Sequence, residues 1–315
     1  MGQRVIVSVT ANTTLDQTLF VPVLPLNRTI RATGQIISMG GKPTDASWIL
    51  GEMGLESLAL GFYGGAFGHK VVDLLAQKGV RSDFITVRGE TRMNTVIVIE
   101  DGSGQLTVTT STLIVDPPHV DELHRRLQAV LPQASVVILG GTLPQGMTPQ
   151  FYSEVIGLIR AAGVPTIFDA DQPNLSVGLS AGPTYVKPNQ HELEALMGHP
   201  IPDVETAYRA GLDILARYGT RPVITLGEIG ALAVLGADRA FYVPPLPIEV
   251  VSTSGAGDAM LAGLAAAIHR GLPIEEGVRL GAAASAAVCI QPGTAMCDRA
   301  DIERFLPQVE LRPYP

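Results

Sequence analysis

Short runs of β-branched and other apolar residues recur along the chain and predict buried strands. The first run is Val5–Val9, and similar runs lie at residues 136–139, 166–168, 185–186 and 223–226. Apolar runs bounded by turn residues are typical of strands that are covered on both faces.

Amphipathic segments of helical length lie between these strands, for example at residues 149–162 and 204–218. In the first of them, four apolar residues fall on one helical face: Phe151, Val155, Leu158 and Ile159. Strands that alternate with helices predict a mostly parallel sheet with helices on both faces.

Two stretches, 12–40 and 91–115, break this alternation, because they carry Thr, Val and Ile with little helical period. In the second, Thr95–Glu100 and Leu106–Thr109 flank an Asp-Gly-Ser-Gly turn, which predicts a β-hairpin. We therefore expect a small β-sheet at the edge of the core that serves as a lid. No repeat or polar linker divides the 315 residues, so we expect residues 1–315 to form a single domain.

The chain is acidic: 22 Lys and Arg against 30 Asp and Glu give a formal net charge of −8. This charge, with no basic run, argues against binding to nucleic acid or to an anionic membrane surface. No apolar stretch approaches the roughly 18 residues that span a bilayer, and the first residues lack the features of a signal peptide. Cys289 and Cys297 are too few for a disulfide framework. We expect a cytoplasmic protein.

The sharpest motif is Gly255-Ala256-Gly257-Asp258, which opens a helical segment of small residues. Free N–H groups at the start of a helix and the helix dipole together form an anion site. Asp258 lies beside that site, where a carboxylate can accept a proton from a hydroxyl group. The alternative is that Asp258 only caps a buried helix. No Gly-x4-Gly-Lys-Ser/Thr sequence occurs, and no Gly-x-Gly-x-x-Gly follows the first strand, which argues against a P-loop and a dinucleotide fold.

Further polar clusters follow predicted strands or open predicted helices. Asn12 and Asp16 follow the first strand, where open α/β sheets place ligand-binding groups. Gly40, Gly41, Lys42 and Asp45 could bring backbone and polar groups against a polyol. Turn formation and helix capping are the alternative for both clusters.

Asn189 and Glu192 lie three residues apart at a predicted helix start. Their oxygens could orient hydrated Mg²⁺, or they could simply cap the helix. Residues 225–227 form a turn suited to phosphate or ribose. Arg28 and Arg92 lie on the predicted lid and could bind a substrate phosphate, unless they are ordinary solvated surface residues.

Taken together, these motifs resemble the ribokinase/PfkB family of sugar kinases, near its phosphofructokinase and tagatose-6-phosphate kinase branch. The resemblance extends over nearly the whole chain, and the motifs occur in the family's order. They are residues 12–16, 40–42, 91–94, 141–146, 187–192, 225–231 and 255–258.

The resemblance implies a ribokinase-like three-layer α/β/α core with a mostly parallel sheet plus a small β-sheet lid. It implies a kinase that transfers the γ-phosphoryl group of MgATP to a hydroxyl of fructose 1-phosphate, fructose 6-phosphate or tagatose 6-phosphate. Asp258 would be the general base, and the amides of Gly255, Ala256 and Gly257 would stabilise the transferring group. The resemblance also implies a homodimer through the lid and a monovalent cation near Gly293.

The resemblance further implies which residues bind the substrates. The sugar hydroxyls would be held by Asp16, Gly40, Gly41, Lys42 and Asp45. The phosphate of the sugar would be held by Arg92 with Arg28. The nucleotide would be bound by Lys187, Asn189, Thr225, Gly227, Gly230, Thr253 and Gly257. Mg²⁺ would be held through water by Asn189 and Glu192.

Three segments depart from the family pattern, and all lie toward the sugar. Where the family has Gly-x-Asn after the lysine, this chain has Pro43-Thr44-Asp45, so that a carboxylate replaces a neutral amide. Residues 109–112 lack the Glu-x-Asn of this branch, and 169–172 replace Asp-x-Ser-Gly. Two alternatives therefore stay open: a kinase of an unphosphorylated sugar or nucleoside, and a non-catalytic sugar or nucleotide sensor.

Overall fold

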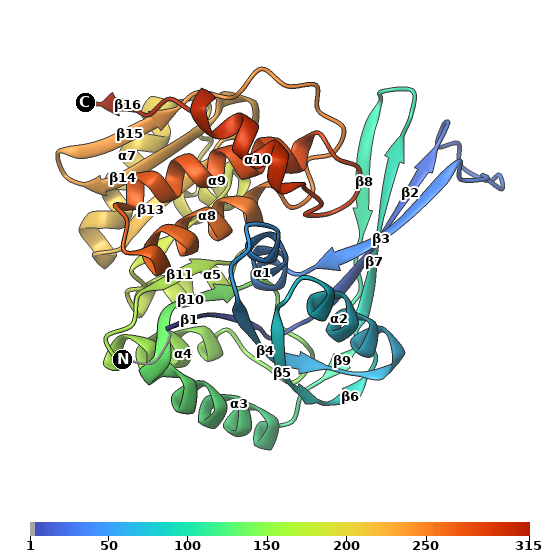
Figure 1. Cartoon of the computed structure of the whole chain (residues 1–315), viewed down its shortest axis with the longest axis horizontal. Coiled ribbons are helices and arrows are strands. Elements are labelled where there is room, and N and C mark those ends of the chain that lie inside the picture. The colour runs from blue at the N-terminus through green and yellow to red at the C-terminus, as the bar shows by residue number, and fades with distance from the viewer. Residues whose placement is uncertain (1–3) are drawn as a thin grey trace.

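A ten-stranded sheet runs through the computed structural model, which describes residues 4–315 (Figure 1). In spatial order its strands are β16 (Arg312–Tyr314), β15 (Arg239–Val243), β14 (Ala231–Gly236), β13 (Arg221–Thr225), β12 (Tyr185–Val186), β11 (Thr166–Asp169), β10 (Ala134–Gly140), β1 (Val5–Thr10), β4 (Ser57–Tyr63) and β5 (Arg81–Thr86). Neighbours from β13 to β5 run parallel, whereas β14, β15 and β16 extend the sheet antiparallel. The expected mostly parallel sheet is confirmed. Part of the N-terminal segment on which the signal-peptide expectation rests, residues 1–3, lies outside the described residues.

Helices cover both faces of this sheet and make three layers. One face carries α1 (Lys42–Glu52), α2 (Gly65–Gln77), α8 (Ala256–Arg270), α9 (Ile274–Cys289) and α10 (Arg299–Phe305). The other carries α3 (Pro117–Val130), α4 (Gln150–Ala161), α5 (Asn174–Ser180), α6 (Gln190–Met197) and α7 (Val204–Tyr218). Along β1 the side chains alternate, so that Ile6 packs in the first core and Val7 in the second. None of the described helices is long and apolar enough to cross a membrane.

Helix α4 buries a broader face than the sequence predicts. Phe151, Val155 and Ile159 are buried as expected, but Leu158 is only half-buried. Tyr152 is fully buried, because its hydroxyl donates a hydrogen bond to the carbonyl oxygen of Gly141 at 2.8 Å. A tyrosine with a buried partner can therefore join an apolar face that hydrophobicity alone does not assign to it.

A separate four-stranded sheet projects from the edge of the core, as Figure 1 shows, and is the predicted lid. Its strands are β3 (Gly34–Gly40), β2 (Thr14–Val21), β7 (Arg92–Ile99) and β8 (Gly104–Val108). The hairpin predicted from the Asp-Gly-Ser-Gly turn is present as β7 and β8.

The second lid segment ends before the predicted residue 115. Strand β9 (Leu113–Ile114) pairs instead with β6 (Arg88–Gly89), and Leu113 and Val115 are buried in the main core. These apolar residues bring the chain back under the core, so that the lid strands of this segment end at residue 108.

The contact between α8 and α9 determines where α8 lies against the sheet. Its surfaces are built from Ala and Gly, and the two backbones come so close that a Cβ on Gly263 would overlap the backbone nitrogen of Gly281. Because small residues let helices approach closely, α8 is buried almost along its whole length. This packing holds the N-terminus of α8 at the carboxyl ends of the strands.

We predict that Gly263→Ala lowers the free energy of unfolding by about 1–3 kcal/mol, because the added methyl group has no room in this contact. The matched control is Gly157→Ala on α4, where a Cβ meets no atom within 4 Å. That substitution should instead stabilise the protein by about 0.5–1 kcal/mol, because it reduces the entropy of the unfolded chain. Urea denaturation measures both. Equal stability of Gly263→Ala and the wild type would contradict the prediction.

Candidate functional site

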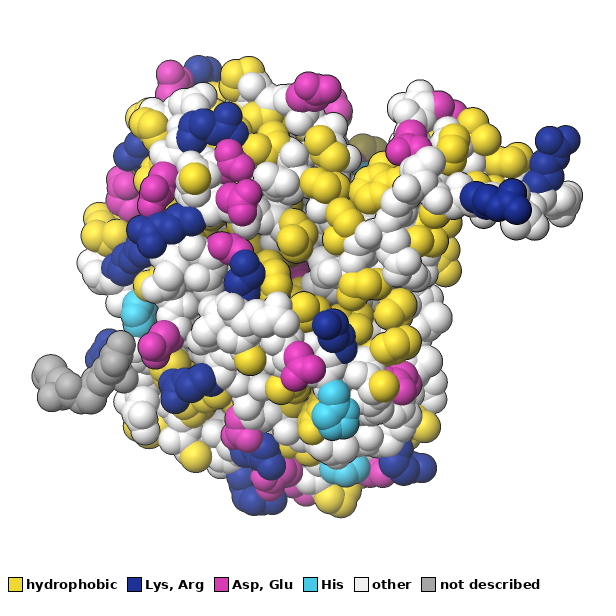
Figure 2. Space-filling view, turned by 45° about the vertical axis from the view of Figure 1, so that its right-hand side comes forward, with side chains coloured by type: hydrophobic (Ala, Val, Ile, Leu, Met, Phe, Trp, Pro, Cys, Tyr) yellow, Lys and Arg dark blue, Asp and Glu magenta, His cyan; other side chains and the backbone are white. Residues whose placement is uncertain are grey.

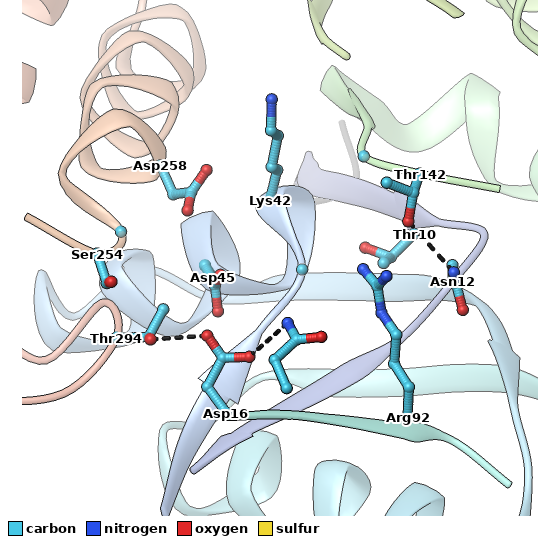
Figure 3. Close-up of a pocket in the computed structure, with 14 residues that line it drawn as sticks. Thr10, Asn12, Asp16, Lys42, Asp45, Arg92, Thr142, Ser254, Asp258 and Thr294 are labelled. Atoms are coloured by element: carbon cyan, nitrogen blue, oxygen red, sulfur yellow. Dashed lines mark hydrogen bonds between the residues drawn. The ribbon is translucent and has the colours of Figure 1, made fainter. Parts of the chain in front are cut away.

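A cavity of about 240 Å³ lies between the carboxyl ends of the central strands, the lid and the N-terminus of α8 (Figure 3). Its walls come from segments that are distant in sequence. The lining residues are Thr10, Asn12, Asp16, Gly41, Lys42, Asp45, Arg92, Asn94, Gly141, Thr142, Ser254, Gly255, Asp258 and Thr294.

Asp16 on β2 forms the lid side of the cavity. Its carboxylate accepts hydrogen bonds from Asn94 Nδ2 at 2.9 Å and from Thr294 Oγ1 at 2.7 Å (Figure 3). Burial raises the pKa of Asp16, and these two hydrogen bonds oppose the rise. A Cβ on Gly40 would overlap the Asp16 carboxylate, so Gly40 contributes to the site by leaving room for Asp16.

Arg92 on β7 brings a guanidinium group to the cavity. Its Nε donates to Thr14 Oγ1 at 2.7 Å and its Nη1 to Thr109 Oγ1 at 3.0 Å, which fixes the side chain. Burial lowers the pKa of Arg92. Arg28 does not join it, because it lies exposed in the connection between β2 and β3 and is not among the residues that line the cavity.

The predicted Gly-Ala-Gly-Asp turn forms the N-terminus of α8. Gly255 is the N-cap with a φ of 86°, and a Cβ there would overlap the backbone nitrogen of Ala295, so only glycine fits. The amide of Ala256 makes a long hydrogen bond of 3.3 Å to Thr253, and the amide of Asp258 bonds to Gly255 at 3.0 Å. Of these two amides only that of Ala256 is loosely held, and Gly255 itself lines the cavity.

Asp258 is buried in the first turn of α8 and points into the cavity (Figure 3). Burial raises the pKa of Asp258 to about 7, the charge of Asp169 adds to the rise, and Lys187 and Lys42 oppose it. A buried carboxyl whose pKa lies near neutrality is suited to accept a proton in a reaction.

Asp169, which the sequence analysis did not assign to the site, binds two lysines, of which Lys42 lines the cavity. Lys42 Nζ lies 2.7 Å from Asp169 Oδ1, and Lys187 Nζ lies 2.9 Å from Oδ2. Lys42 also reaches Glu192 Oε1 at 2.6 Å. Burial would raise the pKa of Asp169, but the two lysines outweigh it and the pKa is lowered. Burial would likewise lower the pKa of Lys42, but Asp169 and Glu192 raise it.

Asn189 and Glu192 form a capping box at the start of α6, which was the alternative to a metal site. Asn189 Oδ1 accepts from the Glu192 amide, and Glu192 Oε2 accepts from the Asn189 amide, both at 2.9 Å. Each of these two oxygens keeps a lone pair that can accept a further hydrogen bond from a water molecule. Asn189 and Glu192 therefore fit a hydrated Mg²⁺, which prefers oxygen ligands and keeps several of its waters. The two roles are compatible.

The predicted nucleotide-binding residues lie outside the 240 Å³ cavity, along neighbouring strand ends. Thr225 ends β13 and bridges to Asn189, and Gly227 and Gly230 flank the short 3₁₀ turn that follows. Thr253 is exposed, with Gln105 Nε2 of the lid 3.4 Å from its hydroxyl. Lys187 Nζ would lie 3.2 Å from a Cβ on Gly257, so this lysine lies beside the turn that opens α8.

Several cavity residues were not among the predicted site residues. Thr142 is one of them, and its Oγ1 accepts a hydrogen bond at 3.2 Å from Nδ2 of Asn12, a residue that the sequence analysis noted after the first strand. Thr294 carried no local signal, because it reaches Asp16 from a loop near the other end of the chain. The others are Thr10, Asn94, Gly141 and Ser254.

We predict that Asp169→Asn lowers the free energy of unfolding by about 3–5 kcal/mol at neutral pH, because it leaves the buried Lys187 without its partner. The pKa of Asp169 is lowered in the folded protein, so its stabilisation is present above the ordinary aspartate range and is lost on acidification. The difference between variant and wild type should therefore shrink toward low pH. Denaturant titration at several pH values measures it. Glu303→Gln, in an exposed pair with Arg299, is the control and should change little.

Comparisons with known proteins identify the family of this chain. The sequence pattern described as "pfkB family carbohydrate kinase" matches residues 9–301. The chain is 33% identical to a 1-phosphofructokinase of Haloferax volcanii over 298 residues, which are 94% of this chain and 95% of that protein. It is 28% identical to the 1-phosphofructokinase of Escherichia coli K12 over 316 residues, which cover 100% of both.

A solved structure confirms the expected ribokinase-like fold. The crystal structure of phosphofructokinase-2 from Escherichia coli in complex with potassium matches with a TM-score of 0.88 and 26% identity. The match covers 97% of this chain and 99% of that one.

Proposed function

Because this chain belongs to the pfkB family of carbohydrate kinases, we propose that it transfers the γ-phosphoryl group of ATP to a hydroxyl of a phosphorylated ketohexose. The observation that carries the proposal is the position of Asp258, which lies in one cavity with the turn at Gly255 on one side and Arg92 on the other. Of fructose 1-phosphate, fructose 6-phosphate and tagatose 6-phosphate, the names of the two relatives favour fructose 1-phosphate.

In this proposal Asp258 is the general base. With a pKa of about 7 it is about half ionised at neutral pH and mostly ionised above it, and it is basic enough to take the proton of the attacking hydroxyl. Asp16 is held rigid by Asn94 and Thr294 and accepts a hydrogen bond from a second sugar hydroxyl. Lys42 lines the cavity and is itself held by two carboxylates, so it contributes a fixed positive charge.

The donors at the start of α8 receive the transferring phosphoryl group. The amides of the 255–257 turn and the helix dipole favour negative charge there, and Lys187 adds a cation beside Gly257. Thr225, Gly227, Gly230 and Thr253 line the neighbouring strand ends as the site for the rest of the nucleotide.

Mg²⁺ is the cofactor of this proposal, and Asn189 and Glu192 would hold it through water. When bound, the ion neutralises charge on the phosphates of ATP. A monovalent cation near Gly293 is a further proposal. The E. coli relative was crystallised with potassium, and here the loop of Gly293 packs on the turn before α8, with the Ala295 amide bonded to Ser254 at 3.0 Å.

We also propose a homodimer formed through the lid. Hydrophobic side chains gather on the face of the lid that Figure 2 shows, and Val23, Leu26 and Val108 are exposed. Burial of such side chains favours association. A cytoplasmic location remains part of the proposal, and the free thiols of Cys289 and Cys297 fit a reducing compartment.

We predict that Asp258→Asn lowers kcat by about 10²- to 10⁴-fold, because the amide cannot accept the proton of the hydroxyl. Coupled assays of ADP release with a panel of sugars and sugar phosphates measure turnover, and thermal unfolding checks the fold. Asp121→Asn, an exposed position on α3, is the control and should keep normal turnover. Near-normal turnover of Asp258→Asn would exclude the general base. A wild-type protein that turns over no acceptor would favour the sensor.

We predict that Arg92→Ala raises KM for the sugar phosphate by about 10- to 100-fold with a smaller effect on kcat, since it removes charge-assisted hydrogen bonds to the phosphate. Steady-state kinetics measure both constants. Arg209→Ala, an exposed arginine on α7, is the control. An unchanged KM would instead favour the kinase of an unphosphorylated sugar or nucleoside.

A further inference from the structure

Asp45 stands where the family pattern has asparagine, and it is buried in the first turn of α1 with 2% of its surface exposed. Asp45 lines the same cavity as Asp258, which comes from α8. Figure 3 shows both side chains at the same end of the cavity. Two neighbouring carboxyl groups can form a hydrogen bond with each other only if one of them carries a proton.

The surroundings of Asp45 disfavour a negative charge on it. Its Oδ1 is buried and has no hydrogen-bond partner among the described residues. The charged groups that face it are themselves acidic: Asp258 from α8 and Asp16 from β2. Burial and these two charges raise the pKa of Asp45 well above its ordinary value.

Lys42 lies on the same helix but is turned away. Its ammonium group is bonded to Asp169 and Glu192, so it does not pair with Asp45. The hydroxyl groups of Thr10 and Thr44 are bonded to each other at 3.4 Å and bring no charge to Asp45. A negative charge on Asp45 would therefore be buried without a compensating cation, which is costly.

Asp258 is the member of the pair that is better suited to be ionised. It faces Lys187 from the segment after β12 and Lys42 from α1, which oppose the effect of Asp169 from β11. It also lies in the first turn of a helix, where the dipole favours an anion. The asymmetry of these charges assigns the proton to Asp45.

We propose that Asp45 is a neutral carboxylic acid at the pH of the reaction, and that it donates its proton in a hydrogen bond that holds the Asp258 carboxylate toward the acceptor hydroxyl. The inference rests on the proposed role of Asp258 as base. Asp45 is a positioning residue for that base. The single proton of the neutral acid is used in the hydrogen bond to Asp258. The other oxygen of Asp45 can therefore only accept a hydrogen bond, and it favours a sugar hydroxyl that donates one.

The charge of the folded protein tests the protonation state without any measurement of activity. Asp45→Asn should leave the electrophoretic mobility of the native protein unchanged at pH 8, because an amide replaces a neutral acid. Asp121→Asn is the matched control and should shift the mobility by one charge. A shift of one charge for Asp45→Asn would overturn the proposal, whatever the turnover of the wild type.

The infrared or ¹³C NMR signal of a protonated carboxyl group provides a measurement that does not depend on the folding of a variant. The signal is expected in the wild type at pH 8 and should disappear in Asp45→Asn, whereas Asp16→Asn should retain it. Its absence from the wild type would overturn the proposal.

The pH profile of kcat/KM tests the positioning role. The hydrogen bond from Asp45 lowers the pKa of Asp258, and an amide is a weaker donor than an acid, so the acid limb of Asp45→Asn should move to higher pH. If Asp45 were ionised, its removal would take away a neighbouring negative charge and move the limb to lower pH. A lower limb would thus contradict the proposal, and a protein without turnover would refute the kinase rather than the proton on Asp45.

Discussion

The site depends on one buried carboxylate, Asp169, and on the lysines that it binds. Lys42 begins α1 and Lys187 follows β12, so the carboxylate at the end of β11 connects three segments of the chain. A buried charge without a partner costs free energy. If one of these segments moved away, it would leave a buried charge on the others unpaired. Lys42 extends the connection to Glu192 on α6. Lys42 therefore lines the cavity with its charge already balanced by buried carboxylates.

Much of the fold could be predicted because its signals are local. The apolar runs of β1 and β10 are buried on both faces, and the Asp-Gly-Ser-Gly turn specifies the hairpin of β7 and β8. The residue at which the second lid segment ends could not be predicted from such local signals. Leu113 and Val115 alternate like lid residues, but they are buried in the main core, and only the tertiary packing decides between the two.

The candidate site was predictable where a backbone conformation or a turn requires particular residues, as at Gly255. Ion pairs gave no such signal. Lys42 lies 127 positions from Asp169, so no local pattern links the two. An aspartate at the end of a strand can also have many other roles. Arg28 stays a prediction, since it is exposed between β2 and β3 and does not line the cavity of this chain. The substitution at Asp45 was visible, but its meaning depends on a neighbour from α8 that no local pattern reveals.

The hydrogen bond from Thr294 to Asp16 joins residues separated by 278 positions. During synthesis the N-terminal part of a chain emerges first, and contacts of high sequence separation form late. Asp16 and its lid strands are thus exposed to the cell long before their last partner has been translated. A nascent chain that stops short of residue 294 can build most of the sheet and still lack the wall that completes the pocket. The pocket is thus completed only after residue 294 has been added to the chain.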